Sequence, residues 1–270
     1  MTLDLVLGTV FGRWYVTLFG LAYLYYGRRL LGAGRLALYS LIAFAVAAVS
    51  ENASVQWGIP YTRYSFNEAL RAHELFLGNV PLAVPLSYTF VMFFAFGAAR
   101  YVAAGPWRTA PRSRPASYVL AVVFATWSTW TLDPVSQRGA AWYLGDLFHY
   151  AGPGFWFGLP LLSQVGWLVV SALLCGLLAV LTPAAAPAPV AHPSRHPLLP
   201  CFITMLVQNL HVAVVALLIG ETTLGGAGFI IWAPALTVAT VLWIELHALA
   251  REATATSSST GRGTSLHDAA

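Results

Sequence analysis

Seven long apolar stretches run through this chain, and they constrain its fold more than any other feature. A helix that crosses a bilayer needs about 20 mostly apolar residues. The stretches of this kind cover residues 5–26, 36–50, 80–99, 116–132, 155–181, 198–220 and 228–249. The chain is 58% hydrophobic and only 9% charged, whereas soluble domains carry about 25% charged residues. The sequence therefore predicts an all-α, polytopic membrane helix bundle of about seven transmembrane helices.

The distribution of arginines predicts the orientation of this bundle. Alternate connections and the C-terminal tail contain Arg28, Arg29, Arg35, Arg100, Arg108, Arg112, Arg114, Arg195, Arg251 and Arg262. The opposite connections contain only Arg63, Arg71 and Arg138. Because basic residues accumulate in cytoplasmic loops, we expect the N-terminus outside and the C-terminus in the cytoplasm. The Arg- and Ala-rich composition, without lysine, indicates a bacterial source and hence a bacterial cytoplasmic membrane.

We expect residues 1–250 to form a single transmembrane domain with two polar motif loops, 51–79 and 133–154, on the non-cytoplasmic side. The Pro- and Ala-rich segment 182–197 is typical of a flexible linker and would lie in the cytoplasm. The Ser- and Thr-rich residues 251–270 predict a disordered cytoplasmic tail.

Acidic residues gather on the predicted non-cytoplasmic side. They are Glu51, Glu68, Glu74, Asp133, Asp146 and Glu221. Two readings remain open, because these acids could be solvated loop ends or could form a shared site. Glu51 follows an apolar run and is either a solvated helix end or a partly buried acid. Asp133 precedes Pro134, which disfavours a helical conformation there, so we expect Asp133 at a helix break, where it could also cap backbone groups.

Large aromatic residues crowd the region around the two aspartates, including Trp130, Trp142, Phe157 and Trp167. An interfacial aromatic belt accounts for some of them. Aromatic faces also attract cations, so these residues could line a pocket that holds a carbocation without trapping it.

Ionisable residues within apolar spans are candidates for function. Arg13 lies in the middle of the first predicted span, and we expect it to pair with an acid such as Glu51. His211 lies in the sixth span at a similar depth. We favour a structural role for it, as a residue hydrogen-bonded within the bundle, over a functional role. Arg13, His211, Asp146 and Glu221 are possible supporting residues around the two candidate acids.

The sequence lacks the motifs of several other chemistries. It contains no P-loop, no dinucleotide-binding G-x-G-x-x-G, no H-E-x-x-H and no Asp-rich diphosphate motif. We therefore expect no cofactor, no metal and no nucleic-acid partner. Metal-free acid catalysis on an apolar substrate remains as the leading hypothesis.

Two ordered motifs resemble a known family. The pattern E-x6-G-x-P-x2-R-Y-x-F, from Glu51 to Phe66, resembles the first motif of the integral-membrane carotenoid biosynthesis family that includes the CruF-type carotenoid 1,2-hydratases. The later residues Leu132-Asp133-Pro134, Trp142, Gly158-x-Pro160 and Gly166-Trp167 resemble its second signature. The likeness covers about residues 45–170. Thr129 departs from it, since family members often carry an additional aspartate there.

The resemblance implies acid-initiated addition to an alkene of a carotenoid or polyprenyl chain, with Glu51 and Asp133 as the catalytic pair. Arg63 and Tyr64 would position them, and the aromatic residues named above would line the pocket. Water would capture the cation in a hydratase, whereas an internal alkene would capture it in a membrane terpene cyclase. A non-catalytic seven-helix binder or transporter is the alternative outside enzymes. The expected partners are the lipid-soluble substrate, the bilayer and other isoprenoid pathway enzymes.

Overall fold

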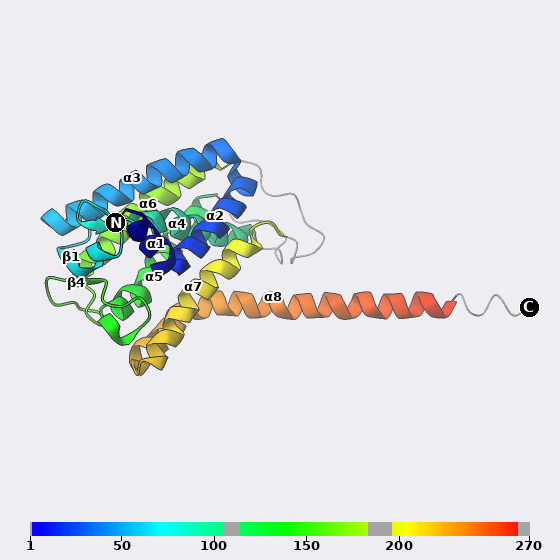
Figure 1. The fold of residues 1–270 in the computed structure, drawn as a ribbon. Coiled ribbons are helices and arrows are strands. Elements are labelled where there is room, and N and C mark those ends of the chain that lie inside the picture. Colours follow the sequence, from blue (N-terminus) through cyan, green and yellow to red (C-terminus); the bar gives the residue numbers. More distant parts are fainter. Residues whose placement is uncertain (1, 105–113, 183–195, 264–270) are drawn as a thin grey trace, which may run out of the picture.

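The computed structural model describes residues 2–104, 114–182 and 196–263, and within these it is a bundle of eight α-helices with short strands at one end (Figure 1). The helices are α1 (Thr2–Gly12), α2 (Trp14–Leu31), α3 (Ala33–Trp57), α4 (Ala83–Ala104), α5 (Arg114–Ser136), α6 (Leu161–Leu181), α7 (Leu199–Leu218) and α8 (Thr222–Gly263). The strands are β1 (Tyr64–Phe66), β2 (Phe76–Leu77), β3 (Val80–Pro81) and β4 (Phe148–Tyr150). Two short 3-10 helices, η1 (Glu68–Ala72) and η2 (Gly139–Ala141), complete the connections.

Every predicted apolar stretch forms a helix or a helix pair, which confirms the all-α, polytopic membrane fold. Within the described ranges, five helices are long and apolar enough to cross a bilayer, and the bent pair α1–α2 makes a sixth. The helix α5 is less apolar because it carries several Ser and Thr residues. It packs against α4, α6, α7 and α8, so its polar side chains face other helices and not lipid.

The first predicted span is broken, which corrects the expectation of one continuous helix. The axes of α1 and α2 differ by 79°. Arg13 lies at the break with φ −108° and ψ 45°, outside the helical region. Its side chain is held by groups outside the two helices, as described below, and these contacts fix the bend.

The end of α5 also differs from the prediction. Asp133 does not mark a helix break, because α5 continues through Pro134 to Ser136. A proline inside a helix leaves the carbonyl four residues earlier without its usual N–H donor. Here that carbonyl belongs to Trp130, and it accepts a hydrogen bond of 2.9 Å from the indole nitrogen of Trp156. The replacement donor makes the helical conformation tolerable at Pro134.

Two short strands join the two motif loops. β1 pairs antiparallel with β4, so that Tyr64 lies opposite Tyr150 and Phe66 opposite Phe148. Figure 1 shows both strands together at one end of the bundle. The two candidate acids lie beside these loops but on helices: Glu51 is in α3 and Asp133 in α5, so the irregular segments begin several residues later than predicted. The pairing of β1 with β4 sets the distance between the loops.

The C-terminal helix is longer than predicted. α8 continues to Gly263, so residues 251–263 of the expected disordered tail are helical in the structure. The segment begins REATA, whose Arg, Glu and Ala residues favour helix. Most of the predicted linker 182–197 and the last residues of the chain lie outside the described residues.

Candidate active site

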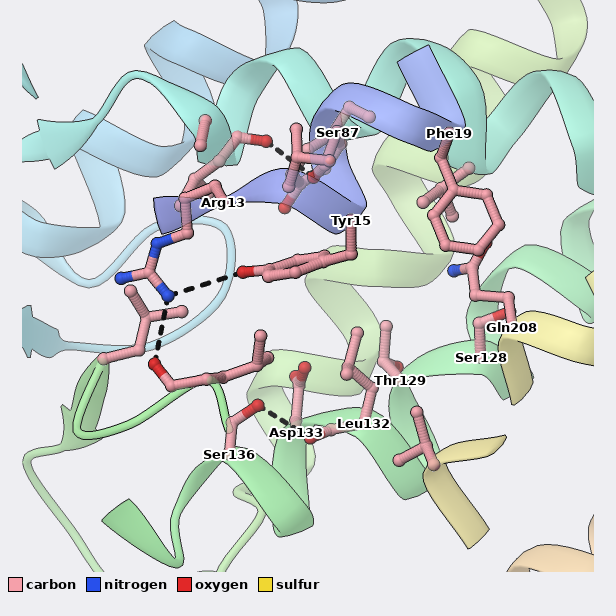
Figure 2. A pocket seen from close by; sticks show the side chains of 18 of the residues that line it. Arg13, Tyr15, Phe19, Ser87, Ser128, Thr129, Leu132, Asp133, Ser136 and Gln208 are labelled. Carbon is pink, nitrogen blue, oxygen red and sulfur yellow. Dashed lines mark hydrogen bonds between the residues drawn. The ribbon is translucent and has the colours of Figure 1, made fainter. Parts of the chain in front are cut away.

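A cavity of about 630 Å³ lies beside the paired loops and is lined by both candidate acids, Glu51 and Asp133. Figure 2 shows Asp133 in this cavity. Side chains of α2, α4, α5 and α7 form most of its wall, together with Glu51 of α3, residues of α6 such as Trp167, and residues of the two motif loops such as Tyr64 and Tyr150. Most of the lining is aliphatic or aromatic. The carboxyl groups of Glu51 and Asp133 are therefore acids at the edge of an apolar space.

Glu51 is almost fully buried, with 5% of its surface exposed. Each of its carboxyl oxygens accepts a hydrogen bond from a tyrosine: Oε2 from the Tyr64 hydroxyl and Oε1 from the Tyr88 hydroxyl. Burying an acid is costly unless hydrogen bonds compensate for the lost water. The two tyrosines provide that compensation and fix the orientation of the carboxyl group.

Asp133 is buried to a similar degree and has a different set of partners. Its Oδ2 accepts a hydrogen bond of 3.0 Å from Tyr150, whose hydroxyl also lies 2.9 Å from Ser163 Oγ. The indole of Trp167 also interacts with this carboxyl. Asp133 and Glu51 line the same cavity, and the charge of Glu51 acts on Asp133.

The β1–β4 pairing positions the tyrosines that bind these acids. Tyr64 and Tyr150 are directly opposite each other in the register, and their rings are 5.9 Å apart. Burial raises the pKa of both phenols well above its ordinary value, and the carboxyl that each one contacts acts in the same direction. Both hydroxyls therefore stay protonated and remain donors at neutral pH.

The two family-like motifs also meet at the turn that follows α3. Gly58 ends α3 in the left-handed conformation, with φ 78°. A side chain at Gly166 of α6 would lie 2.6 Å from the carbonyl oxygen of Pro60, so glycine is needed for this close approach. The approach brings the next residue, Trp167, onto Tyr88 with the rings stacked at 4.7 Å. Trp167 therefore contacts Tyr88, which is hydrogen-bonded to Glu51, and also lines the cavity.

Arg13 does not pair with Glu51, and the expected pairing with that acid is wrong. Its guanidinium binds Glu74 through two contacts, from Nη2 to Oε1 at 2.7 Å and from Nε to Oε2 at 3.0 Å. Nη1 also donates to the carbonyl of Leu144 at 3.0 Å (Figure 2). Because the acid cluster held several possible partners, the sequence could not single out Glu74. Arg13 lines the cavity, but its guanidinium binds Glu74 of one motif loop and Leu144 of the other, and so connects α1 and α2 to both loops.

His211 also lines the cavity and has partners on both ring nitrogens. Nδ1 lies 3.1 Å from the carbonyl oxygen of Gln208, which can only accept, so Nδ1 carries the hydrogen. Nε2 lies 2.7 Å from the hydroxyl of Tyr143, within hydrogen-bonding distance. Burial raises the pKa of Tyr143 to about 12. This arrangement matches the structural reading of His211 as a satisfied residue.

Six of the predicted site residues lie outside the cavity lining. They are Arg63, Trp130, Trp142, Phe157, Asp146 and Glu221. Each has a structural contact. Arg63 donates to the carbonyl of Gln56, Trp130 packs against Trp156, and Trp142 lies in a buried apolar cluster. The carbonyl of Phe157 and the carboxylate of Glu221 both bind Arg138, and Asp146 bonds to Asn67.

Sequence reasoning missed Tyr61 and Tyr88, and it counted Tyr150 among the crowded aromatic residues without predicting its contact with Asp133. Tyr61 belongs to the first motif and its ring lies 5.5 Å from Trp167. Tyr88 is the one polar aromatic at the start of an otherwise apolar helix, which is a usable signal because a buried phenol needs a partner. Tyr150 becomes visible only through the strand pairing.

In the part of the chain that the structure describes, no three His, Cys, Asp or Glu side chains are grouped as metal ligands. The donors present at the site are two carboxyls, several phenols and serine hydroxyls. This donor set can hold and transfer protons and can hold a water molecule.

The fold and the site together define a multi-pass membrane protein with a buried acid pair beside an apolar cavity. The model of the carotenoid biosynthesis protein family matches residues 9–244, so the chain belongs to that family. The match supports a role in carotenoid biosynthesis and a lipid-soluble isoprenoid substrate. No curated protein and no solved structure matches the chain.

Proposed function

We propose that this protein is a membrane enzyme that protonates an alkene of a carotenoid or polyprenyl chain and then adds water to it. The observation that carries the proposal is the pair of buried carboxyls, Glu51 and Asp133, at the edge of an apolar cavity in a member of this family. An unactivated alkene is a weak base, so its protonation needs a strong local acid and stabilisation of the cation that forms.

The contacts favour Asp133 as the proton donor. Both oxygens of Glu51 already accept tyrosine hydroxyls, an arrangement that suits the ionised form. Asp133 accepts one tyrosine hydroxyl, from Tyr150, and its other contact, with the Trp167 indole, makes a smaller contribution to stabilising its charged form. Because two neighbouring buried carboxyls cannot readily carry two negative charges, the pair holds one proton. We assign that proton to Asp133 and the negative charge to Glu51.

In this assignment Asp133 transfers its proton to the less substituted carbon of the terminal trisubstituted alkene and leaves a tertiary cation on the chain-end carbon that bears two methyl groups. The Glu51 carboxylate stabilises the cation electrostatically, and the faces of Tyr88 and Trp167 contribute cation–π attraction. A water molecule then adds to the cation and loses a proton to Asp133, which restores the acid. Ser136 and Ser163 are hydroxyls of the lining that can position this water.

Cyclisation is the second candidate, and the apolar character of most of the lining favours it. If the water is excluded, an internal alkene of the same chain can attack the cation. The two reactions share the first step and the same acid pair. They differ in the mass of the product, because hydration adds one water and cyclisation leaves the mass unchanged.

The test uses the purified protein in lipid nanodiscs with acyclic carotenoid substrates. Asp133→Asn should lower turnover by roughly 10²–10⁴-fold, the usual contribution of a general acid. Glu51→Gln should also lower turnover, because it removes the charge that stabilises the cation. Wild-type turnover by Asp133→Asn would contradict the assignment.

Asp146→Asn and Glu68→Gln provide matched controls. Both acids are on the same side of the bundle, but their side chains are 42% and 72% exposed and neither lines the cavity. Both variants should keep wild-type turnover. If the control variants lost as much turnover as the Glu51 and Asp133 variants, the activity would depend on the overall negative charge of this end of the bundle and not on the buried pair.

A further inference from the structure

A groove between α2 and α7 continues the catalytic cavity along the bundle. Both helices pack against α4, and α4 side chains such as Phe90 and Val91 border the cavity between them. Phe19 of α2 and Gln208 of α7 lie on the side of the cavity away from Arg13 (Figure 2). The cavity thus extends away from the acids along these two helices.

A second cavity of about 480 Å³ continues the same path. It is bordered by Tyr26 and Leu30 of α2 and by Leu199 and Ile203 of α7. Thr204 borders both cavities, so the two meet at this residue. From Leu199 to Val212, the stretch of α7 along this path spans roughly 20 Å by helical rise. That is about two thirds of the hydrocarbon thickness of a bilayer.

The edge of the groove faces outward from the bundle. Leu18 of α2 and Val207 of α7 both line the first cavity and are both 56% exposed. Ile203 lines the second cavity and is 49% exposed. In a membrane helix such side chains contact lipid acyl chains. The groove is therefore accessible from the bilayer over much of its length.

We propose that this α2–α7 groove binds the apolar chain of the substrate, which enters sideways from the bilayer and presents its terminal alkene to the acid pair. The identity of the occupant rests on the proposed function. Continuity with the acid-bearing cavity, a length of about two thirds of the hydrocarbon thickness of a bilayer and an apolar, outward-facing edge all suit a long acyclic isoprenoid chain. Thr204, which borders both cavities, and Ile203, in the second cavity, then determine how long a chain can be accommodated.

Photo-crosslinking tests where the chain lies without depending on turnover. A photoreactive amino acid is placed at Val207 in the full-length Asp133→Asn protein, which is incubated in nanodiscs with a deuterium-labelled acyclic tetraterpene. The control position is Leu218, which is also on α7 and exposed but borders neither cavity. The proposal predicts tetraterpene adducts at Val207 and not at Leu218. Equal labelling at both positions, no labelling, or phospholipid adducts alone would overturn it.

Chain-length selectivity gives a second readout. Ile203→Trp, in the second cavity, should raise KM for the tetraterpene by roughly tenfold and leave a monoterpene substrate, whose chain is too short to reach that cavity, unaffected, whereas Leu218→Trp should change neither. An equal effect on both substrates would reject the groove. Adducts at Val207 together with no product from the wild-type protein would support the groove as the binding site and reject only the proposed chemistry. Product from the wild-type protein without adducts at Val207 would reject only the groove as the binding site.

Discussion

The ion pair between Arg13 and Glu74 gives the clearest prediction of stability. Its side chains are only 6% and 7% exposed, and two N–H groups of the guanidinium face the two carboxylate oxygens. Glu74→Gln keeps the shape of the side chain and one acceptor oxygen but removes the charge. Since an unpaired buried charge costs roughly 3–5 kcal/mol, the variant should lose about that much free energy of unfolding.

The assay is denaturant unfolding in detergent micelles, followed by tryptophan fluorescence. Glu68→Gln is the matched control, because Glu68 also pairs with an arginine, Arg71, at 2.5 Å but is 72% exposed. An exposed pair contributes about 1 kcal/mol or less. The double variant Arg13→Met, Glu74→Leu should recover most of the loss, since it leaves no unpaired charge. Equal losses in Glu74→Gln and Glu68→Gln would refute the reasoning.

Two further predictions concern the motif contact and pH. Gly166→Ala should lower the free energy of unfolding by about 1–3 kcal/mol, because the new methyl group would meet the Pro60 carbonyl; an unfolding midpoint equal to wild type would contradict this. Arg138 bonds to Glu221 and lowers the pKa of that carboxyl. The pair therefore contributes its full stabilisation at pH values above the ordinary pKa of glutamate. This stabilisation is lost as the pH falls through the lowered pKa. Because Glu221 is 36% exposed, the pair should contribute less than about 1 kcal/mol to the free energy of unfolding. Unfolding curves of the wild type and of Arg138→Gln, recorded from neutral to acidic pH, will measure this contribution.

The helices and the general position of the acids could be predicted from the sequence because both follow from local composition. Apolar stretches of span length mark the helices, and the side of the bundle on which Glu51 and Asp133 lie follows from counting those stretches. The partners of the acids could not be predicted in the same way. Tyr64 and Tyr150 meet because two three-residue strands pair across the bundle, and strands this short carry little sequence signal.

The break at Arg13 and the helical Asp133 show how tertiary contacts override local preference. An arginine within an apolar run predicts an unusual partner but does not identify Glu74, which comes from a loop far along the chain. Proline predicts a break at the preceding residue. In this fold, Trp156 instead supplies a donor to the carbonyl that Pro134 leaves free, and the helix continues.

The central claim is that a protein carboxyl transfers a solvent-exchangeable proton to a carbon of the substrate. Turnover of an acyclic carotenoid in heavy water, followed by mass spectrometry and NMR of the product, tests it directly. The account predicts one carbon-bound deuterium on the carbon next to the new hydroxyl-bearing carbon, together with the mass of one added water, and no such product from Asp133→Asn. A product that carries no carbon-bound deuterium from the solvent would contradict it.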